Sequence, residues 1–379
     1  MSEQPTPAAS EPVAAVQPLP EEAPLVVLIP SSELVSNPRR PRPGLIEAIL
    51  WCVVFLLTQL TAALVVTAGV LAGFAVVQEH PWEFALGQLA ALGQGQRSGG
   101  EKLDSSPDTD SRQEDQTSHD SRQDQAPPDS GQDREQPPTV ETSSAKVPRE
   151  ISLALVYGML GAQVASWWLI RRVVPRVVGT NWKQKIGWRR PRVCQLLIVL
   201  LAVVPFMVLA GGLQELLKWL GAGEHLQIAD SLRAIFQHAP LVVTLAATAL
   251  GPGVVEEVWC RGFLGHGLTV RYGLIPGVVW TSLLFGLLHL DPAYALVTAA
   301  MGAYLHFVFL MCGSIVAPIM LHTLNNALAV LATLYPSMLP ALATDGPGLS
   351  LVGYALAAIV LVGCSYALWR TRPRTSLTI

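Results

Sequence analysis

Charged residues are scarce in this chain, and the shortage excludes most soluble fold classes. Only 14% of the 379 residues are Asp, Glu, Lys or Arg, and 51% are hydrophobic. Soluble domains carry about 25% charged residues. The formal net charge of −3 carries little information, because it averages segments of opposite sign. The composition therefore predicts an all-α, polytopic membrane protein.

Cysteine is also infrequent, with five residues and no CxxC pair. All five lie in or beside apolar stretches, so we expect inert buried thiols rather than a disulfide framework or a zinc–cysteine site. No secretory signal peptide is expected, because the first apolar run is too long and too internal. No nucleic-acid partner is expected either.

Long apolar runs are what the chain does contain. The first covers residues 45–77 and exceeds the roughly 20 residues needed to cross a bilayer. Further spans are predicted at about 151–170, 194–213, 239–260, 272–289, 293–311, 314–334 and 350–369. We therefore predict a transmembrane helix bundle of about eight spans.

Basic residues test this number, because Lys and Arg favour the cytoplasmic side. They precede the first span at Arg39, Arg40 and Arg42, fill the 171–192 loop, and follow the last span from Arg370. Eight spans place all three groups on one side. The protein is thus expected in the inner or plasma membrane, with both termini cytoplasmic.

Two polar segments divide the chain. Residues 1–43 are Pro-rich and predict a disordered cytoplasmic tail. Residues 93–149 predict a disordered acidic low-complexity linker, because eleven acidic and four basic residues between 101 and 135 leave too little apolar surface to offset the ordering entropy. The remaining predicted units are the first span with its flank (44–92), the second span with a basic loop (150–193), a membrane-embedded core (194–371) and a cytoplasmic tail (372–379).

The first polar cluster in the apolar region is Glu256-Glu257 with Arg261, in GVVEEVWCRGF. An ionisable side chain at membrane depth costs roughly 2.5–3.5 kcal/mol on insertion scales, so it usually marks a working site. Glu257 and Arg261 are four residues apart and share a helix face, which predicts an ion pair. Glu256 points about 100° away and stays free for general-base work. The alternative is a plain interfacial charge cluster.

Two more pairs have the same spacing of four residues. Phe285 and His289 end one predicted span, and His322 and Asn326 lie in another. An imidazole and a carboxamide on one helix face can stabilise an oxyanion. They can also simply hydrogen-bond across a helix interface. Together, the three clusters predict a site that activates water.

The predicted topology leaves one conflict. Glu256 falls near the inner end of span 239–260, whereas His289 falls near the outer end of span 272–289. The two side chains can meet only if these boundaries are shifted or if a helix is broken and partly re-entrant. The GPG at 251–253 and the Gly-Pro residues at 276–277 are the candidate breaks.

The three clusters read EExxxR, FxxxH and HxxxN, and this series resembles the CPBP family of intramembrane proteases. That family includes the type II CAAX prenyl endopeptidases and the Abi proteins. The resemblance covers about residues 200–334. It implies that Glu256 activates a water with help from His289, while His322 and Asn326 bind the oxyanion. Glu257, Arg261 and Phe285 would support the site.

The resemblance also leaves the cofactor open. Glu256, His289 and His322 could form a His₂Glu zinc set, as zinc peptidases do. The chain has no HExxH motif, and we favour a metal-free glutamate mechanism with no cofactor. The expected partners are the lipid bilayer and a membrane-tethered peptide or protein substrate. The alternatives are a non-catalytic relative that binds a peptide or regulates a partner, and a transporter, which would show internal repeats.

Overall fold

The computed structural model describes residues 42–77, 87, 147–222, 229–340, 342 and 349–373. The predicted disordered tail and acidic linker lie almost entirely outside these residues. Within them every regular element is helical, which confirms the all-α prediction. The longer helices are α2 (Leu45–Val77), α4 (Arg149–Val178), α6 (Val193–Leu217), α11 (Leu274–Leu287), α12 (Pro292–Cys312), α13 (Val316–Leu334) and α14 (Leu351–Arg370).

One helical segment is continuous but irregular. It runs from α8 (Leu241–Leu245) through a π-helical turn η3 (Ala246–Leu250) into α9 (Gly251–Glu257). A second π-helical stretch, η4 (Val258–Leu264), follows and leads into α10 (Gly265–Tyr272). The predicted span 239–260 is therefore too short, because the helix continues to residue 272. Glu256 lies halfway along it instead of near one end.

The following helix shows the opposite difference. Seven helices in the described part of the chain are long and apolar enough to cross a membrane, and α11 is not one of them. Its 14 residues extend about 21 Å, less than the roughly 30 Å of a hydrocarbon core. The predicted span 272–289 is thus a shorter helix. It ends because Leu290 adopts a left-handed φ of 62° and Asp291 caps α12 by accepting a hydrogen bond from Tyr294 N.

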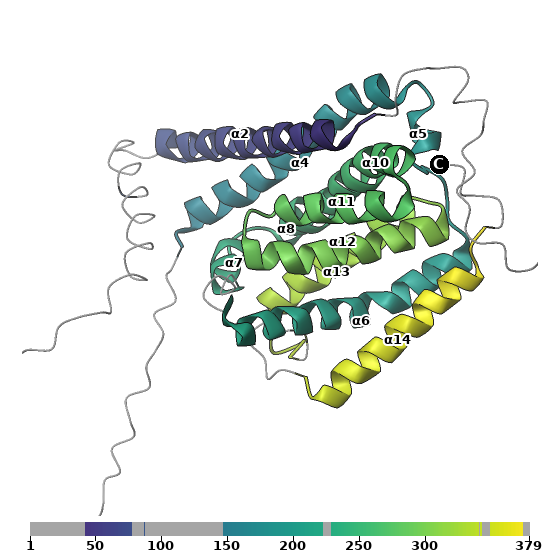
Figure 1. Ribbon diagram of the computed structural model, residues 1–379. Helices are drawn as coiled ribbons and strands as arrows, with labels where there is room; N and C mark the ends of the chain where they lie inside the picture. The colour runs from purple at the N-terminus through teal and green to yellow at the C-terminus, as the bar shows by residue number, and fades with distance from the viewer. Residues whose placement is uncertain are drawn as a thin grey trace, which may run out of the picture.

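The helices form a bundle with α2 and α14 at opposite edges and α12 and α13 between them (Figure 1). α2 packs antiparallel on α4, where Thr67 Oγ1 donates to Ala154 O and Gly158 approaches Ala63. Phe55 of α2 stacks on Trp259 of η4, with ring centroids 4.8 Å apart, so this pair also contacts the irregular helix.

The basic segments gather at one end of the bundle. Arg192 Nη1 donates to Thr371 O, which joins the 171–192 loop to the end of α14. Ile315 N donates to Gly187 O, which adds the turn before α13. The antiparallel α2–α4 pair brings Arg42 to the same end. The described members of the three predicted basic groups thus lie at one end, even though one predicted span is short.

Two smaller predictions have different outcomes. The amphipathic segment between α6 and α8 includes α7 (Ala229–Phe236), which is tied to the bundle because Arg233 Nε donates to Thr333 O. Its residues 223–228 lie outside the described part. All five cysteines are free, but Cys194 is exposed, so the prediction of buried thiols is wrong for that residue. It occupies the first turn of α6, beyond the apolar contacts of the bundle.

Candidate active site

The short helix α11 brings His289 to the depth of the Glu pair. α11 runs antiparallel to the irregular helix. From one contacting pair to the next, the residue number rises by four on α11 and falls by four on the irregular helix. A β-carbon on Gly277 would lie 2.6 Å from Thr269 Cα, and one on Gly265 would lie 3.7 Å from Thr281 Cγ2. The guanidinium of Arg261 lies 4.2 Å from the centre of the Phe285 ring. The next step of this series places residue 289 at the level of residue 257, which removes the conflict in depth.

Glu257 and Arg261 form the predicted ion pair. Arg261 Nη1 lies 2.6 Å from Glu257 Oε1, and neither side chain is exposed to solvent. Arg261 Nη2 also donates to Gly302 O at 3.0 Å. A β-carbon at position 302 would lie 3.2 Å from Arg261 Nη2, so glycine there admits the guanidinium. A buried charge of this kind needs both a partner and further hydrogen bonds, and Arg261 has them.

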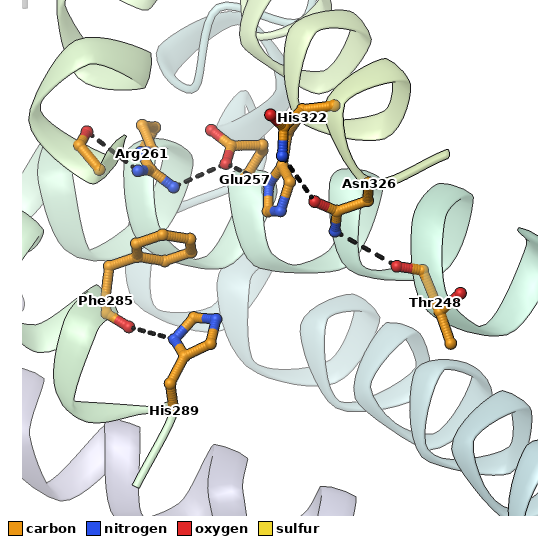
Figure 2. A network of polar contacts seen from close by, with 9 residues as sticks. Thr248, Glu257, Arg261, Phe285, His289, His322 and Asn326 are labelled. Carbon is orange, nitrogen blue, oxygen red and sulfur yellow. Dashed lines mark hydrogen bonds and ion pairs between the residues drawn. The ribbon is translucent and has the colours of Figure 1, made fainter. Parts of the chain in front are cut away.

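Glu257 has a second partner that the sequence did not indicate. His322 Nδ1 lies 2.9 Å from the same Oε1 atom (Figure 2). An arginine-paired carboxylate is an acceptor, so Nδ1 carries the hydrogen and donates. Nε2 is then the nitrogen left for other contacts. A carboxylate that holds Nδ1–H fixes the tautomer and the orientation of the ring.

His289 is held by its own helix. Its Nδ1 lies 3.0 Å from Phe285 O, and because a carbonyl can only accept, Nδ1 must carry the hydrogen. The Nε2 lone pair of neutral His289 therefore remains available. In Figure 2 the ring lies beside Phe285, on the side away from Arg261.

Phe285 is the common neighbour of the three motifs. Its ring centroid lies 5.2 Å from that of His289 and 5.8 Å from that of His322, both in edge-to-face contact. The Arg261 guanidinium also contacts the Phe285 ring. The two imidazoles and the ion pair are thus brought together around one aromatic ring, as the series of motifs predicts.

Glu256 lies on the side of the turn between α11 and α12. It is half-buried, and within the described residues no hydrogen bond or ion pair holds its carboxylate. The ring of Tyr294, near the start of α12, lies 5.5 Å from that of His289. Tyr294 is therefore a neighbour of His289 that sequence reasoning missed. The available signal was its position in DPAY, five residues after His289.

Asn326 lies one turn after His322 on α13 and contacts the irregular helix at Thr248. Its Nδ2 donates to Thr248 O at 3.2 Å, and its Oδ1 accepts from Asn325 Nδ2 at 3.2 Å. These contacts fix which end of the carboxamide is nitrogen. One Nδ2 hydrogen remains for a ligand. The neighbouring Asn325 is buried.

The candidate zinc set does not assemble in this arrangement. Among the described residues, no group of three His, Cys, Asp or Glu side chains is placed to hold a metal ion. The carboxylate that approaches His322 is that of Glu257 rather than Glu256. Glu256, His289 and His322 are therefore not arranged as a zinc set in the described part of the chain.

Comparison with known proteins identifies the segment that holds this site. Residues 238–328 match the family of type II CAAX prenyl endopeptidase Rce1-like proteins. All three motifs fall inside this Rce1-like segment, so the predicted resemblance is confirmed over a shorter range than 200–334.

A bacterial protein is also similar. "Putative membrane peptidase YdiL" from Bacillus subtilis (strain 168) is 25% identical over 175 residues. The alignment covers 44% of this chain and 66% of the relative. No solved structure matches. The two similarities point to a protease of the membrane CAAX type, and neither of them assigns catalytic residues or a substrate.

Proposed function

We propose that this chain is an intramembrane endopeptidase that hydrolyses peptide bonds of membrane-embedded or lipidated substrates. The observation that carries the proposal is the meeting of the three polar motifs around Phe285 inside the Rce1-like segment. Glu257, Phe285 and His322 come from three different helices that the fold brings into contact, and His289, in the turn after α11, lies beside Phe285. Charges and imidazoles at this depth cost free energy, so their presence usually marks a functional site.

Glu256 is the proposed general base. Its carboxylate is not neutralised by Arg261, which is bound to Glu257. It removes a proton from a water molecule as the water oxygen bonds to the scissile carbonyl carbon. His289 orients this water, because its Nε2 lone pair can accept the second water hydrogen. When the carbon–nitrogen bond breaks, the proton on Glu256 passes to the departing amine.

Asn326 and His322 are the proposed oxyanion donors. Asn326 offers the Nδ2 hydrogen that Thr248 does not use. Since His322 donates Nδ1–H to Glu257, its Nε2 donates only when the ring is protonated. Donors fixed before the reaction stabilise the developing charge, and removal of one costs about 10²–10³ in kcat in well-studied hydrolases.

The substrate class follows from the surroundings of the site. Leu283 and Leu287 on the outer face of α11 are exposed apolar residues, as expected for contact with lipid. A substrate must therefore reach the site from within or beside the bilayer. We propose a membrane-tethered peptide or protein, in an inner or plasma membrane, with the basic end of the bundle and both termini cytoplasmic.

Two substitutions test the proposal with a membrane-tethered reporter peptide. Glu256→Gln and His289→Ala should abolish cleavage while expression and thermal unfolding remain close to wild type. Glu150→Gln and His238→Ala, which make the same changes far from the site, should retain activity. Full cleavage by both site variants would remove the enzyme assignment and leave a non-catalytic peptide-binding protein.

A further inference from the structure

The segment Gly251-Pro252-Gly253 lies one turn before the Glu pair, and each of its residues has a specific contact. A β-carbon on Gly251 would lie 2.5 Å from Gln163 Cγ of α4. A β-carbon on Gly253 would overlap Thr323 Oγ1 of α13 and lie 3.0 Å from the Thr323 backbone nitrogen. Because Gly251 and Gly253 have no β-carbon, α4 and α13 can approach this helix more closely than any larger residue would allow.

Pro252 has no backbone N–H, so it cannot donate the hydrogen bond that another residue could donate at this position. The turn before Pro252 is π-helical, and the Gly251 N–H donates to Ala246 O, five residues back. A residue with an N–H at position 252 could restore the α-helical bond to the Thr248 carbonyl, but proline has none. The Thr248 carbonyl accepts instead from Asn326 Nδ2 of α13, at 3.2 Å (Figure 2). The Thr248 hydroxyl is already bonded to Thr244 O, so the carbonyl is the group that reaches α13.

The contacts of α13 on this helix form an ordered series. Glu257 meets His322, Gly253 meets Thr323, and Thr248 meets Asn326. The residue numbers fall on one helix as they rise on the other, so the two helices cross in an antiparallel sense. Pro252 lies within the contact between the two helices, between the two hydrogen bonds that hold the proposed oxyanion donors.

We propose that Gly251-Pro252-Gly253 is the docking motif for α13, with Pro252 and Gly253 as positioning residues for Asn326 and His322. Pro252 provides the acceptor that orients the Asn326 carboxamide. Gly253 allows α13 to approach closely enough for His322 to reach Glu257. The consequence for catalysis rests on the proposed function, whereas the docking itself does not.

The first experiment combines Pro252→Ala with Asn326→Ala and measures reporter cleavage. Alanine restores an N–H that competes for the Thr248 carbonyl, so Pro252→Ala alone should lower kcat about 10- to 100-fold, up to the range seen on loss of one oxyanion donor. KM should change less than about twofold. In the Asn326→Ala background, Pro252→Ala should have no further effect, because the residue that it positions is absent. Independent, multiplicative losses would overturn the positioning role.

The second experiment needs no activity and combines Gly253→Ala with Thr323→Ala, read by the thermal midpoint in detergent. Gly253→Ala should lower the midpoint, and Thr323→Ala should restore part of the loss by removing the overlapping Oγ1. Gly73→Ala on α2, where a β-carbon would meet nothing within 4 Å, is the matched control.

Additive midpoint shifts would overturn docking at Gly253, even if the reporter is cleaved normally. If Gly253→Ala does not fold, recovery of folded protein in the double variant supports the contact, and failure of both contradicts it. A wild-type protein that cleaves no reporter, but shows coupled midpoints, would contradict the proposed function and leave the docking motif intact.

Discussion

The helices at the edges of the bundle differ from those at its centre in their burial and in their polar contacts. In α2 and α14, 11% of the most apolar stretch is buried, whereas 44% is buried in α12 and α13 (Figure 1). The polar side-chain contacts of the edge helices are single hydroxyl bonds, from Thr67 of α2 to Ala154 O and between Ser365 of α14 and Tyr304 Oη. The central helices carry His322, Asn326 and the carbonyl of Gly302, each bonded to the irregular helix that holds the Glu pair. Polar groups are thus concentrated where protein, rather than lipid, surrounds them.

The difference has a physical cause. Lipid tails are as apolar as leucine, so an edge helix gains little from association and can be hydrophobic on all sides. A central helix is specified by packing and hydrogen bonds, which need particular residues at particular positions. Sequence changes should therefore have large effects at the centre and small effects at the edges, which the following substitutions measure.

The largest effect on stability is expected from Arg261→Met. Removal of the arginine leaves the Glu257 carboxylate buried without its ion-pair partner, and breaking a buried pair in this way costs about 3–5 kcal/mol. The measurement is chemical or thermal unfolding in detergent micelles. Glu257→Gln with Arg261→Met should be milder than Arg261→Met alone, because no charge then remains uncompensated. Equal losses in the two variants would contradict a charge-based explanation.

A smaller effect is expected from the loss of a packed leucine. Leu305 of α12 is fully buried, and Leu64 of α2 is 71% exposed. Leu305→Ala should cost about 2–5 kcal/mol, the range for large-to-small substitutions in cores. Leu64→Ala should change stability by less than about 0.5 kcal/mol, as surface substitutions do. Similar losses at the two positions would show that α2 has a partner that covers its outer face.

The same division explains how much could be predicted from the sequence. The edge helix at 45–77 was predicted with its exact bounds, because a long apolar run is a local signal. The Glu257–Arg261 ion pair was also predicted, since residues four apart meet on any helix. Both predictions depend on short-range geometry alone.

The contacts between central helices were not predicted, because they join distant parts of the chain. Glu257 and His322 are 65 residues apart, and nothing in either motif indicates their hydrogen bond. The roles expected for His322 and Asn326 stay predictions. Residues 251–253 were expected as a candidate break, whereas the helix continues through them and the Thr248 carbonyl has a partner on α13.

The shortness of α11 was missed for a related reason. Its sequence is apolar throughout, so composition predicts a full span at 272–289. The helix ends at Leu287 because the left-handed Leu290 and the capping Asp291 begin the next helix. Asp291-Pro292 is visible in the sequence as a turn, but its distance from the membrane surface is not.

The smallest effect is expected at the start of α2. Arg42 and Glu47 form an ion pair at 2.7 Å, with side chains 56% and 33% exposed. Water and salt screen such a pair, and exposed pairs contribute about 0–1 kcal/mol. Arg42→Gln should therefore shift the thermal midpoint far less than Arg261→Met, and the shift should vanish at high salt. A loss comparable to that of Arg261→Met would mean that this end of α2, where Leu45 N donates to Tyr272 Oη, is held as rigidly as the centre, and the contrast between edge and core helices would then not extend to the start of α2.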